Sequence, residues 1–131
     1  MLTFELETSA RSQALDITRR LEEEVAAAGL AEGWCRVYVP HTTAGVAVNE
    51  AADPDVMADV LAALERLVPW QGGYRHSEGN SAAHIKSILT GSSVQAPIAG
   101  GRLALGTWQG IFFMEFDGPR RRRVLISVSP A

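Results

Sequence analysis

Apolar and polar residues alternate with a period of two in several short stretches of the chain, the pattern of β-strands with one buried face. The alternation predicts seven strands, at residues 2–7, 14–17, 34–39, 44–49, 94–98, 103–116 and 121–128. The sixth strand is interrupted at Gly106-Thr107, and Asp117-Gly118 is predicted to be the hairpin turn between the last two strands. Pro40 follows the third strand and is expected to end it.

Apolar residues at helical spacing predict three helices, from Thr18 to about Ala28, from Asp53-Pro54 to Leu67 and from Ser81 to Thr90. Thr18 and Asp53 are the expected N-caps of the first two, and Pro54 takes the first helical position of the second. Gly29 and Gly91 are expected to end the first and third helices. The element order ββαββααβββ mixes hairpins and helices without regular βαβ alternation, so we expect one α+β domain over residues 1–131.

Composition and charge are those of a globular protein without a nucleic-acid or membrane partner. With 131 residues, 47% hydrophobic and 21% charged, the chain has the balance of an ordinary globular domain. A net charge of −3 gives it no overall attraction to nucleic acid or to anionic membranes. Its single cysteine, Cys35, cannot form an intramolecular disulfide, and the sequence shows neither a basic segment followed by an apolar run at its start nor any apolar run of about 18 residues. We therefore expect a cytoplasmic protein that binds neither nucleic acid nor membrane.

Three histidines stand where polar loops meet regular structure. His41 directly follows a predicted strand, His76 lies in a polar loop, and His84 lies one turn into the helix after that loop. Imidazole suits zinc and other borderline metals, and three protein ligands with an open position form the usual catalytic zinc site. We expect the three histidines to share one metal ion, provided that the loop folds back over the helix. The alternative is that each is an ordinary surface or hydrogen-bonded histidine.

Carboxylates and an amide crowd the junction between the fourth strand and the second helix. Asp53 and Asp55 are explained as the N-cap and as a first-turn charge that complements the helix dipole. Glu50 has no such structural duty, so it is the candidate general base or the hydrogen-bond partner of a histidine. Asn49 is expected to help orient the histidines or the substrate.

The loop ahead of the third helix combines a flexible glycine with many hydrogen-bonding groups. Its candidate residues are Ser77, Glu78, Gly79, Asn80 and Ser81. A helix N-terminus offers free N–H groups, which bind phosphate or sulfate. An ordinary capping loop, with Asn80 as N-cap, is compatible with that role because the same N–H groups serve both.

Thr107, Trp108 and Gln109 stand between two glycines, Gly106 and Gly110, in an otherwise apolar stretch. Glycines inside a strand weaken it and often mark a bulge or a close backbone approach. The segment is therefore either a loop whose side chains face a ligand or a hairpin that buries Trp108 in the core. The pattern leaves both interpretations open.

Four consecutive arginines occupy residues 120–123 at the start of the last strand. Successive side chains of a strand alternate faces, so the run is expected to split into two pairs on opposite sides. No aromatic platform accompanies it, which argues against a nucleic-acid site. We expect a solvated or interface strand, with Arg120 able to reach a phosphate by a bidentate contact.

Taken in order, these motifs resemble those of the YjbQ-like family, and the resemblance runs from about Leu2 to Val128. The segments that carry it are His41-Thr42-Thr43-Ala44-Gly45, Asn49-Glu50, Asp53-Pro54-Asp55, the run from His76-Ser77-Glu78-Gly79-Asn80 to His84, Gly106-Thr107-Trp108-Gln109-Gly110 and Asp117-Gly118-Pro119-Arg120. One such motif is weakly specific, whereas several in register are strongly so. The arginine run is more basic than the family pattern leads us to expect.

The resemblance implies a mixed-sheet α+β fold assembled as a homotrimer, with a metal site at His41, His76 and His84. It also implies the activity of a secondary thiamine-phosphate synthase, which joins hydroxymethylpyrimidine diphosphate to thiazole phosphate and releases pyrophosphate. In such an enzyme we expect Glu50, His76 and His84 to be catalytic. The cation, Arg120 and the loop amides would bind the phosphorylated substrate.

Two other functions fit the same residues. Diphosphate is usually bound as its magnesium complex, and magnesium prefers oxygen ligands. Three imidazoles instead favour zinc, which activates a bound water as hydroxide. The divalent metal is therefore zinc or magnesium, and a metal-dependent phosphoester or diphosphate hydrolase is the enzymatic alternative. A trimeric protein that binds a metal or a phosphorylated metabolite without turnover is the non-catalytic alternative.

Overall fold

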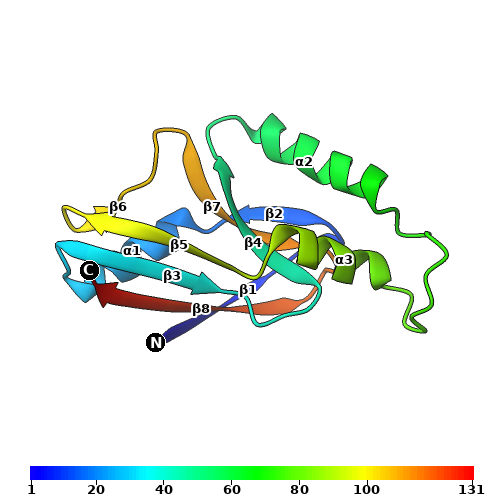
Figure 1. The fold of residues 1–131 in the computed structure, drawn as a ribbon, viewed down its shortest axis with the longest axis horizontal. Helices are drawn as coiled ribbons and strands as arrows, with labels where there is room; N and C mark the ends of the chain where they lie inside the picture. Colours follow the sequence, from blue (N-terminus) through cyan, green and yellow to red (C-terminus); the bar gives the residue numbers. More distant parts are fainter.

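Eight strands form two sheets that pack face to face in the computed structural model, which describes residues 1–131 (Figure 1). The five-stranded sheet has the order β1 (Leu2–Glu7), β8 (Arg121–Pro130), β3 (Glu32–Tyr38), β5 (Ser93–Ala99) and β6 (Arg102–Leu103). The three-stranded sheet has the order β2 (Gln13–Asp16), β7 (Gln109–Glu115) and β4 (Ala44–Glu50). The helices are α1 (Thr18–Ala28), α2 (Pro54–Leu67) and α3 (Ser81–Thr90). None of them has the length and apolar character needed to cross a membrane.

The α+β class predicted from the sequence is confirmed, but the mixed pairing implied by the resemblance is not, because every strand pair in the two sheets is antiparallel. The hairpin predicted at Asp117-Gly118 is also wrong, since β7 and β8 belong to different sheets. Both strands already have a partner on each side: β2 and β4 flank β7, and β1 and β3 flank β8. The turn therefore carries the chain from one sheet to the other. The predicted strand 103–116 is likewise two strands, β6 and β7, separated by a loop.

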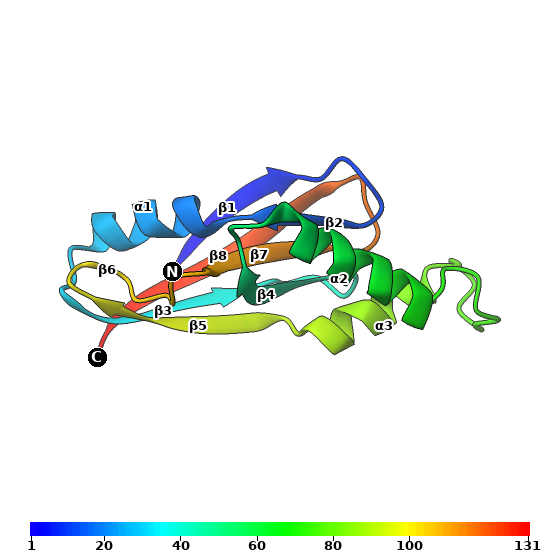
Figure 2. The same ribbon diagram turned by 90° about the horizontal axis from the view of Figure 1, so that it is seen from above.

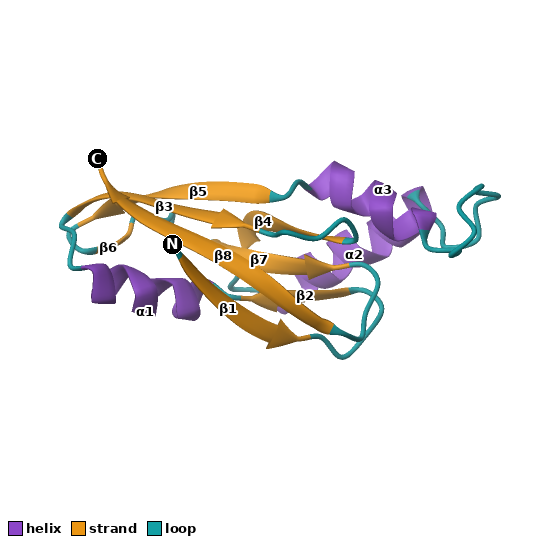
Figure 3. Ribbon diagram, turned by 90° about the horizontal axis from the view of Figure 1, so that it is seen from below, coloured by secondary structure: helices purple, strands orange, loops and turns teal.

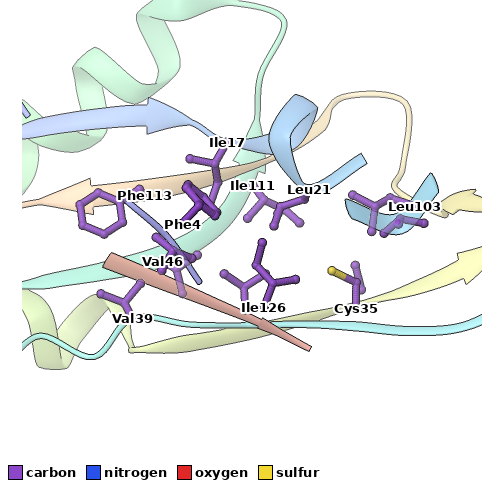
Figure 4. Packing of buried hydrophobic residues seen from close by; sticks show 14 of the residues in the cluster. Phe4, Ile17, Leu21, Cys35, Val39, Val46, Leu103, Ile111, Phe113 and Ile126 are labelled. Carbon is purple, nitrogen blue, oxygen red and sulfur yellow. The ribbon is translucent and has the colours of Figure 1, made fainter. Parts of the chain in front are cut away.

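The main core lies between the two sheets and α1, as Figure 4 shows. Leu21 and Val25 of α1 are fully buried one turn apart. Cys35, Val37 and Val39 are buried at alternate positions in and just after β3, which confirms the period-two pattern. Burial of each valine or leucine side chain contributes about 1.5–3 kcal/mol, so these positions hold the sheets and the helix together.

β7 is buried on both faces. Ile111 and Phe113 pack in the main core, whereas Phe112 and Met114 pack with Met57 of α2 in a second cluster. Figure 2 shows α2 and α3 beside the three-stranded sheet, on the side away from α1. The three-stranded sheet is therefore the middle layer, between the five-stranded sheet and the α2–α3 pair.

The helix ends follow the sequence signals at α2 and depart from them at α1. Asp53 Oδ1 accepts a hydrogen bond from a backbone N–H of the first turn at 2.9 Å, which confirms the predicted cap of α2. Thr18 does not cap α1, because Ile17 holds the N-cap position and the Thr18 hydroxyl instead accepts a bond from Ile111 N at 2.9 Å. Gly29 ends α1 in the left-handed conformation, with φ 69°, as predicted.

Buried contacts on its inner face fix α3 in place. Ala82 and Ala83 have no exposed area, and Ser87 donates its hydroxyl to a backbone carbonyl of β4 at 2.6 Å. Lys86 is 1% exposed and extends to Glu65 of α2, with 2.5 Å between Nζ and Oε2. These contacts tie α3 to both β4 and α2.

Three connections meet at one end of the molecule. In Figures 1 and 3, the β3–β4 loop, the β7–β8 connection and the α2–α3 segment lie together, at the end opposite to α1 and β6. These connections carry most of the polar motifs that the sequence singles out.

Candidate functional site

All three histidines line one polar pocket at the end where the three connections meet. The pocket has a volume of about 530 Å³. Apart from Pro40, its walls are polar and consist of His41, Thr42, Thr43, His76, Glu78, Asn80, His84, Asp117, Arg120 and Arg122. We call this cavity the histidine pocket.

Segments far apart in the sequence build the histidine pocket. The β3–β4 loop supplies His41, the α2–α3 segment supplies His76, and α3 supplies His84. Arg120 comes from the connection after β7, and Arg122 comes from β8. The sequence places each of these residues at or near the end of an element, and the tertiary fold brings the ends together.

His76 and His84 form a close pair on one wall. Their ring centroids are 5.6 Å apart and the rings meet edge to face, at 84°. The loop that carries His76 therefore does fold back over α3, as the sequence required for a shared site. Glu78 lies beside the pair, with 3.9 Å between its Oε1 and His76 Nε2, and both of these side chains are open to solvent. The pair offers imidazole nitrogens and a carboxylate at the mouth of the pocket.

His41 is held differently, by the backbone of β8. Its Nε2 accepts a hydrogen bond from Arg123 N at 2.9 Å. Burial lowers the pKa of His41, and the positive charges of Arg122 and Arg123 lower it further. The imidazole is therefore neutral at physiological pH, and the proton sits on Nδ1 because Nε2 is an acceptor.

A buried ion pair underlies the pocket. Arg122 and Glu115 are 2% and 0% exposed, and Arg122 Nε donates to Glu115 Oε2 at 2.8 Å. Arg122 Nη2 also donates to Thr43 Oγ1 at 2.9 Å, and the Thr8 hydroxyl donates to Glu115 Oε2 at 2.8 Å. Burial alone would raise the pKa of Glu115, but the bonds from Arg122, from the Asp117 N–H and from Thr8 outweigh it and hold the pKa below its usual range.

Sequence reasoning missed this pair, although a signal for it exists. Glu115 is a carboxylate that ends the apolar run Phe112–Met114, and Arg122 occupies an inward position of β8. The expected alternation of the arginine run is confirmed at this point, since Arg122 is buried while its neighbours are exposed. Arg121 faces outward and pairs with carboxylates of β1, which fits the predicted solvated strand.

Asn80, Asp117 and Arg120 form a chain of contacts along another wall. Asn80 Nδ2 donates to Asp117 Oδ2 at 2.8 Å, and Arg120 Nη2 donates to the same oxygen at 3.1 Å. Asn80 holds the N-cap position of α3 but makes no capping bond with its side chain, because Asp117 engages the amide. The Oδ1 of Asn80 is buried and has no hydrogen-bond partner in the chain, so the wall contains an unsatisfied acceptor.

The predicted phosphate loop reaches the histidine pocket only in part. Glu78 and Asn80 line it. Ser77 and Gly79 are exposed and do not, whereas Ser81 lines an adjoining cavity of about 630 Å³ that shares two of the histidines. The loop therefore contributes side chains more than backbone amides to the pocket.

Glu50 and Asn49 lie at the other end of β4 from the histidines. β4 runs for seven residues, which corresponds to about 20 Å from end to end. Within one chain, the expected contact of Glu50 or Asn49 with a histidine is therefore wrong. Glu50 also has the structural duty that the sequence did not reveal, because its Oε2 accepts a bond from Asp53 N at 3.2 Å ahead of α2.

Thr107, Trp108 and Gln109 lie at that same distant end, next to Glu50. The register pairs Gln109 with Glu50 across β7 and β4. Trp108 is 64% exposed, so the interpretation that it fills the core is wrong. Gln109 Oε1 accepts a bond from Gly106 N at 2.9 Å and closes the loop on itself. A chain by itself thus has two separate polar regions, one at each end of β4.

A shell of three histidines around one metal ion does not fit this arrangement. No three His, Cys, Asp or Glu side chains are close enough to hold an ion together. His41 has its Nε2 engaged by Arg123 N and its proton on Nδ1, so it offers no free lone pair. His76 and His84 are the two imidazoles that remain available as ligands.

Comparison with known proteins identifies the family. The model of the family described as "UPF0047 protein YjbQ-like" matches residues 2–131. The chain belongs to this family. UPF0047 relatives include YugU of Bacillus subtilis, 46% identical over 127 residues, which are 96% of each protein. The UPF0047 protein MJ1081 of Methanocaldococcus jannaschii is 44% identical over 128 residues, 98% of this chain and 93% of that protein.

Solved structures of similar proteins have the same fold. The structure from Clostridium acetobutylicum, described as an uncharacterized YjbQ/UPF0047 protein and the YugU ortholog, superposes with a TM-score of 0.97 at 49% identity, over 98% of this chain and 100% of that one. The hypothetical protein APE1520 of Aeropyrum pernix gives a TM-score of 0.93 at 42% identity, over 98% and 97% of the two chains. The sequence and structural similarity therefore establish the family and the fold. The activity has to be inferred from the chemistry of the histidine pocket.

Proposed function

We propose that the histidine pocket binds the phosphate or diphosphate group of a small molecule and catalyses its reaction. The observation that carries this proposal is the composition of the pocket, which gathers three imidazoles, an amide and two guanidinium groups in one polar cavity. Guanidinium groups recognise phosphate oxygens by charge-assisted and often bidentate hydrogen bonds. Arg122 is fixed by Glu115 through Nε and Nη2, which leaves Nη1 without a hydrogen-bond partner in the chain.

The reaction that we propose is that of a secondary thiamine-phosphate synthase. The bond between the pyrimidine methylene carbon and the diphosphate oxygen breaks, and its electron pair leaves with pyrophosphate. The lone pair of the thiazole nitrogen forms the new carbon–nitrogen bond. Such a reaction asks the protein to stabilise the leaving group and to hold two reactants in line. Arg120 and Arg122 would bind the departing pyrophosphate.

A neighbouring cavity provides room for the ring of such a substrate. It has a volume of about 680 Å³ and shares His41 and His84 with the histidine pocket. Tyr38 and Ile88 line it, and their side chains are 50% and 82% exposed. An apolar surface next to anion-binding groups suits a molecule with a heterocycle at one end and a phosphate at the other.

A divalent metal, zinc or magnesium, is part of the proposal; His76 and His84 are the two side chains that would bind it, and Glu78 lies beside them. Imidazole donors favour zinc of the two. When bound, such an ion would neutralise negative charge on phosphate oxygens.

Hydrolysis of a phosphoester or diphosphate is the second candidate. The observation in its favour is the position of Glu78, 3.9 Å from His76 at the solvent-exposed mouth of the pocket. A neutral imidazole oriented by a carboxylate is a suitable general base for water. In this reaction His76 would accept the proton of the attacking water, and the water oxygen would form the new bond to phosphorus. The bond from phosphorus to the leaving oxygen would break, its electron pair would stay on that oxygen, and the proton held by His76 could then pass to it.

We also propose that the chain acts as a homotrimer in the cytoplasm. Ile88 and Leu89 of α3 are 82% and 61% exposed, beside the cavity that contains Tyr38, and such apolar surface favours association. Assembly would also give the residues around Glu50 and Trp108 a route to the pocket of a second chain. For the cytoplasm, the support is the free thiol of Cys35, which has no disulfide partner.

A product assay tests the proposal. The protein is incubated with hydroxymethylpyrimidine diphosphate and thiazole phosphate, with zinc or magnesium, and the products are identified by mass spectrometry. Thiamine phosphate indicates the synthase, and pyrimidine alcohol or monophosphate formed without the thiazole indicates the hydrolase. Tight binding of pyrophosphate without any product from these or other phosphate esters would instead support the non-catalytic binding protein.

His84→Ala separates the site from general folding effects. We expect this variant to lose turnover and bound metal while it keeps its thermal stability. Leu67→Ala is the control, because Leu67 lies at the end of α2, is 74% exposed and lines neither the histidine pocket nor the cavities beside it. Equal activity and metal content in the two variants would contradict the assignment of His84.

A further inference from the structure

We propose that His41 is a hydrogen-bond donor to an anionic oxygen of the substrate, through its Nδ1–H, and that it is not a metal ligand. This inference rests on the proposed function of the histidine pocket. It assigns to His41 a role different from that of the other two histidines, which the sequence had grouped with it.

The position of His41 is set by the five-stranded sheet. β3 and β8 are antiparallel neighbours, with Tyr38 opposite Leu125. Continuation of this register beyond Tyr38 brings the β3–β4 loop alongside the first residues of β8. His41 Nε2 therefore meets the backbone N–H of Arg123, at 2.9 Å, and the ring is anchored to main chain instead of to a mobile side chain.

This bond decides which ring nitrogen carries the proton. A nitrogen that accepts an N–H bond presents its lone pair, so Nε2 is unprotonated and the proton of the neutral ring is on Nδ1. A metal bound at Nε2 would break the 2.9 Å bond from Arg123 N and would release the ring from its anchor on β8. A metal at Nδ1 would have to displace the ring proton. Neither nitrogen is a ready ligand.

The Nδ1–H is available to a ligand. Nδ1 makes no hydrogen bond within the chain and is not among the enclosed, unpaired atoms. The ring lines the same cavity as Arg120 and Arg122, whose charges attract an anion. The acids near the pocket lie against other groups: Glu115 is bonded to Arg122, Asp117 is bonded to Arg120, and Glu78 lies beside His76. The three donors converge on the histidine pocket from the β3–β4 loop and from the chain that follows β7.

Two substitutions separate the functions of the two nitrogens. The carboxamide oxygen of His41→Gln reaches the position of Nε2, so this variant keeps the acceptor for Arg123 N and loses the donor. The carboxamide nitrogen of His41→Asn lies near the position of Nδ1, so this variant keeps the donor and loses the anchor. Inorganic pyrophosphate is the probe, its affinity is measured by calorimetry on the full chain, and bound metal is measured by elemental analysis.

We expect H41Q to bind pyrophosphate roughly tenfold or more weakly, the effect of one lost hydrogen bond to a charged group. H41N should stay within about threefold of the unsubstituted protein, and both variants should keep its metal content. In ¹⁵N NMR spectra of the unsubstituted protein, the proton of the His41 ring should be found on Nδ1.

Three results would overturn the inference: a ring proton on Nε2, unchanged pyrophosphate affinity in H41Q, or loss of metal from both variants. The last result would make His41 a ligand after all. If the unsubstituted protein does not bind pyrophosphate, the proposed function of the pocket fails and the donor role fails with it. If it binds and H41Q binds equally well, only the role of His41 is lost.

Discussion

Arg122 and Glu115 form an ion pair that is almost completely shielded from water, directly beneath the cavity that contains the three histidines. The pair joins the end of β7 to the start of β8, the two strands that belong to different sheets. It thus fixes the connection between the sheets at the place where the pocket needs a defined shape.

Glu115→Gln should destabilise the protein by about 3–5 kcal/mol, because it leaves the guanidinium of Arg122 buried without its counter-charge. Urea unfolding monitored by circular dichroism measures the loss. Glu5→Gln is the matched control, since Glu5 pairs with Arg121 at 3.6 Å on the exposed surface and should cost less than about 1 kcal/mol. A loss in Glu115→Gln no greater than that of the control would show that the buried pair is not needed for stability.

Acid should weaken the fold through the same residue. The pKa of Glu115 is held below its usual range in the folded chain, so the folded state binds the proton less readily than the unfolded state does. The stabilisation is complete above the unfolded pKa of about 4.3 and is lost as the pH falls through the lower folded pKa. The free energy of unfolding, measured from pH 6 to pH 3, should therefore decline less in Glu115→Gln than in the unsubstituted protein. Parallel curves for the two would contradict the assignment.

Loss of Glu65 should destabilise the protein more than loss of the charge on Lys86, its ion-pair partner. Glu65→Gln leaves the ammonium of Lys86, only 1% exposed, without its 2.5 Å partner and should cost about 1–3 kcal/mol. Lys86→Met keeps the length of the side chain and removes the buried charge, so it should be nearly neutral or stabilising. Melting temperatures of the two variants give the comparison. A larger loss in Lys86→Met would mean that the charge itself is stabilising.

Cys35 should be inert toward thiol reagents in the native protein. Burial raises its pKa to about 11, with a further contribution from the negative charge of Glu22, so very little thiolate is present at neutral pH. Ellman's reagent should react with the native protein at least about tenfold more slowly than with the protein unfolded in urea, because the rate follows the thiolate fraction. Rapid labelling of the native protein would show that β3 opens on the timescale of the assay.

Local signals in the sequence predicted the elements better than their pairing. Asp53 and Pro54 specify the start of α2 by themselves, because a cap acts within one helical turn. Asp117-Gly118 is also a local signal, but it says only that the chain turns. Whether the strands on either side pair depends on the neighbours that each strand has already found, and those lie elsewhere in the chain.

The sequence also predicted part of the site, namely the residues whose proximity in space follows from local structure. His76 and His84 are close in sequence and meet in space. Glu50 is also close in sequence to His41, but an extended strand lies between them and carries Glu50 away from the pocket. Arg122 is one of four consecutive arginines, so its residue type alone does not distinguish it. Strand alternation separates it from Arg121 and Arg123, but which face is buried depends on the pairing of β8 with β1 and β3, which the sequence does not give.

The packing of α3 divides the site into a stiff wall and an adjustable rim. Because Ala82 and Ala83 have no free surface, the helix cannot rotate to present His84 differently, and that ring can change only its own side-chain torsions. His76 sits on a segment that contacts solvent along most of its length. We therefore expect the segment that carries His76 to move when bound molecules differ in size or shape. The α3 wall that carries His84 should keep the same position in each complex.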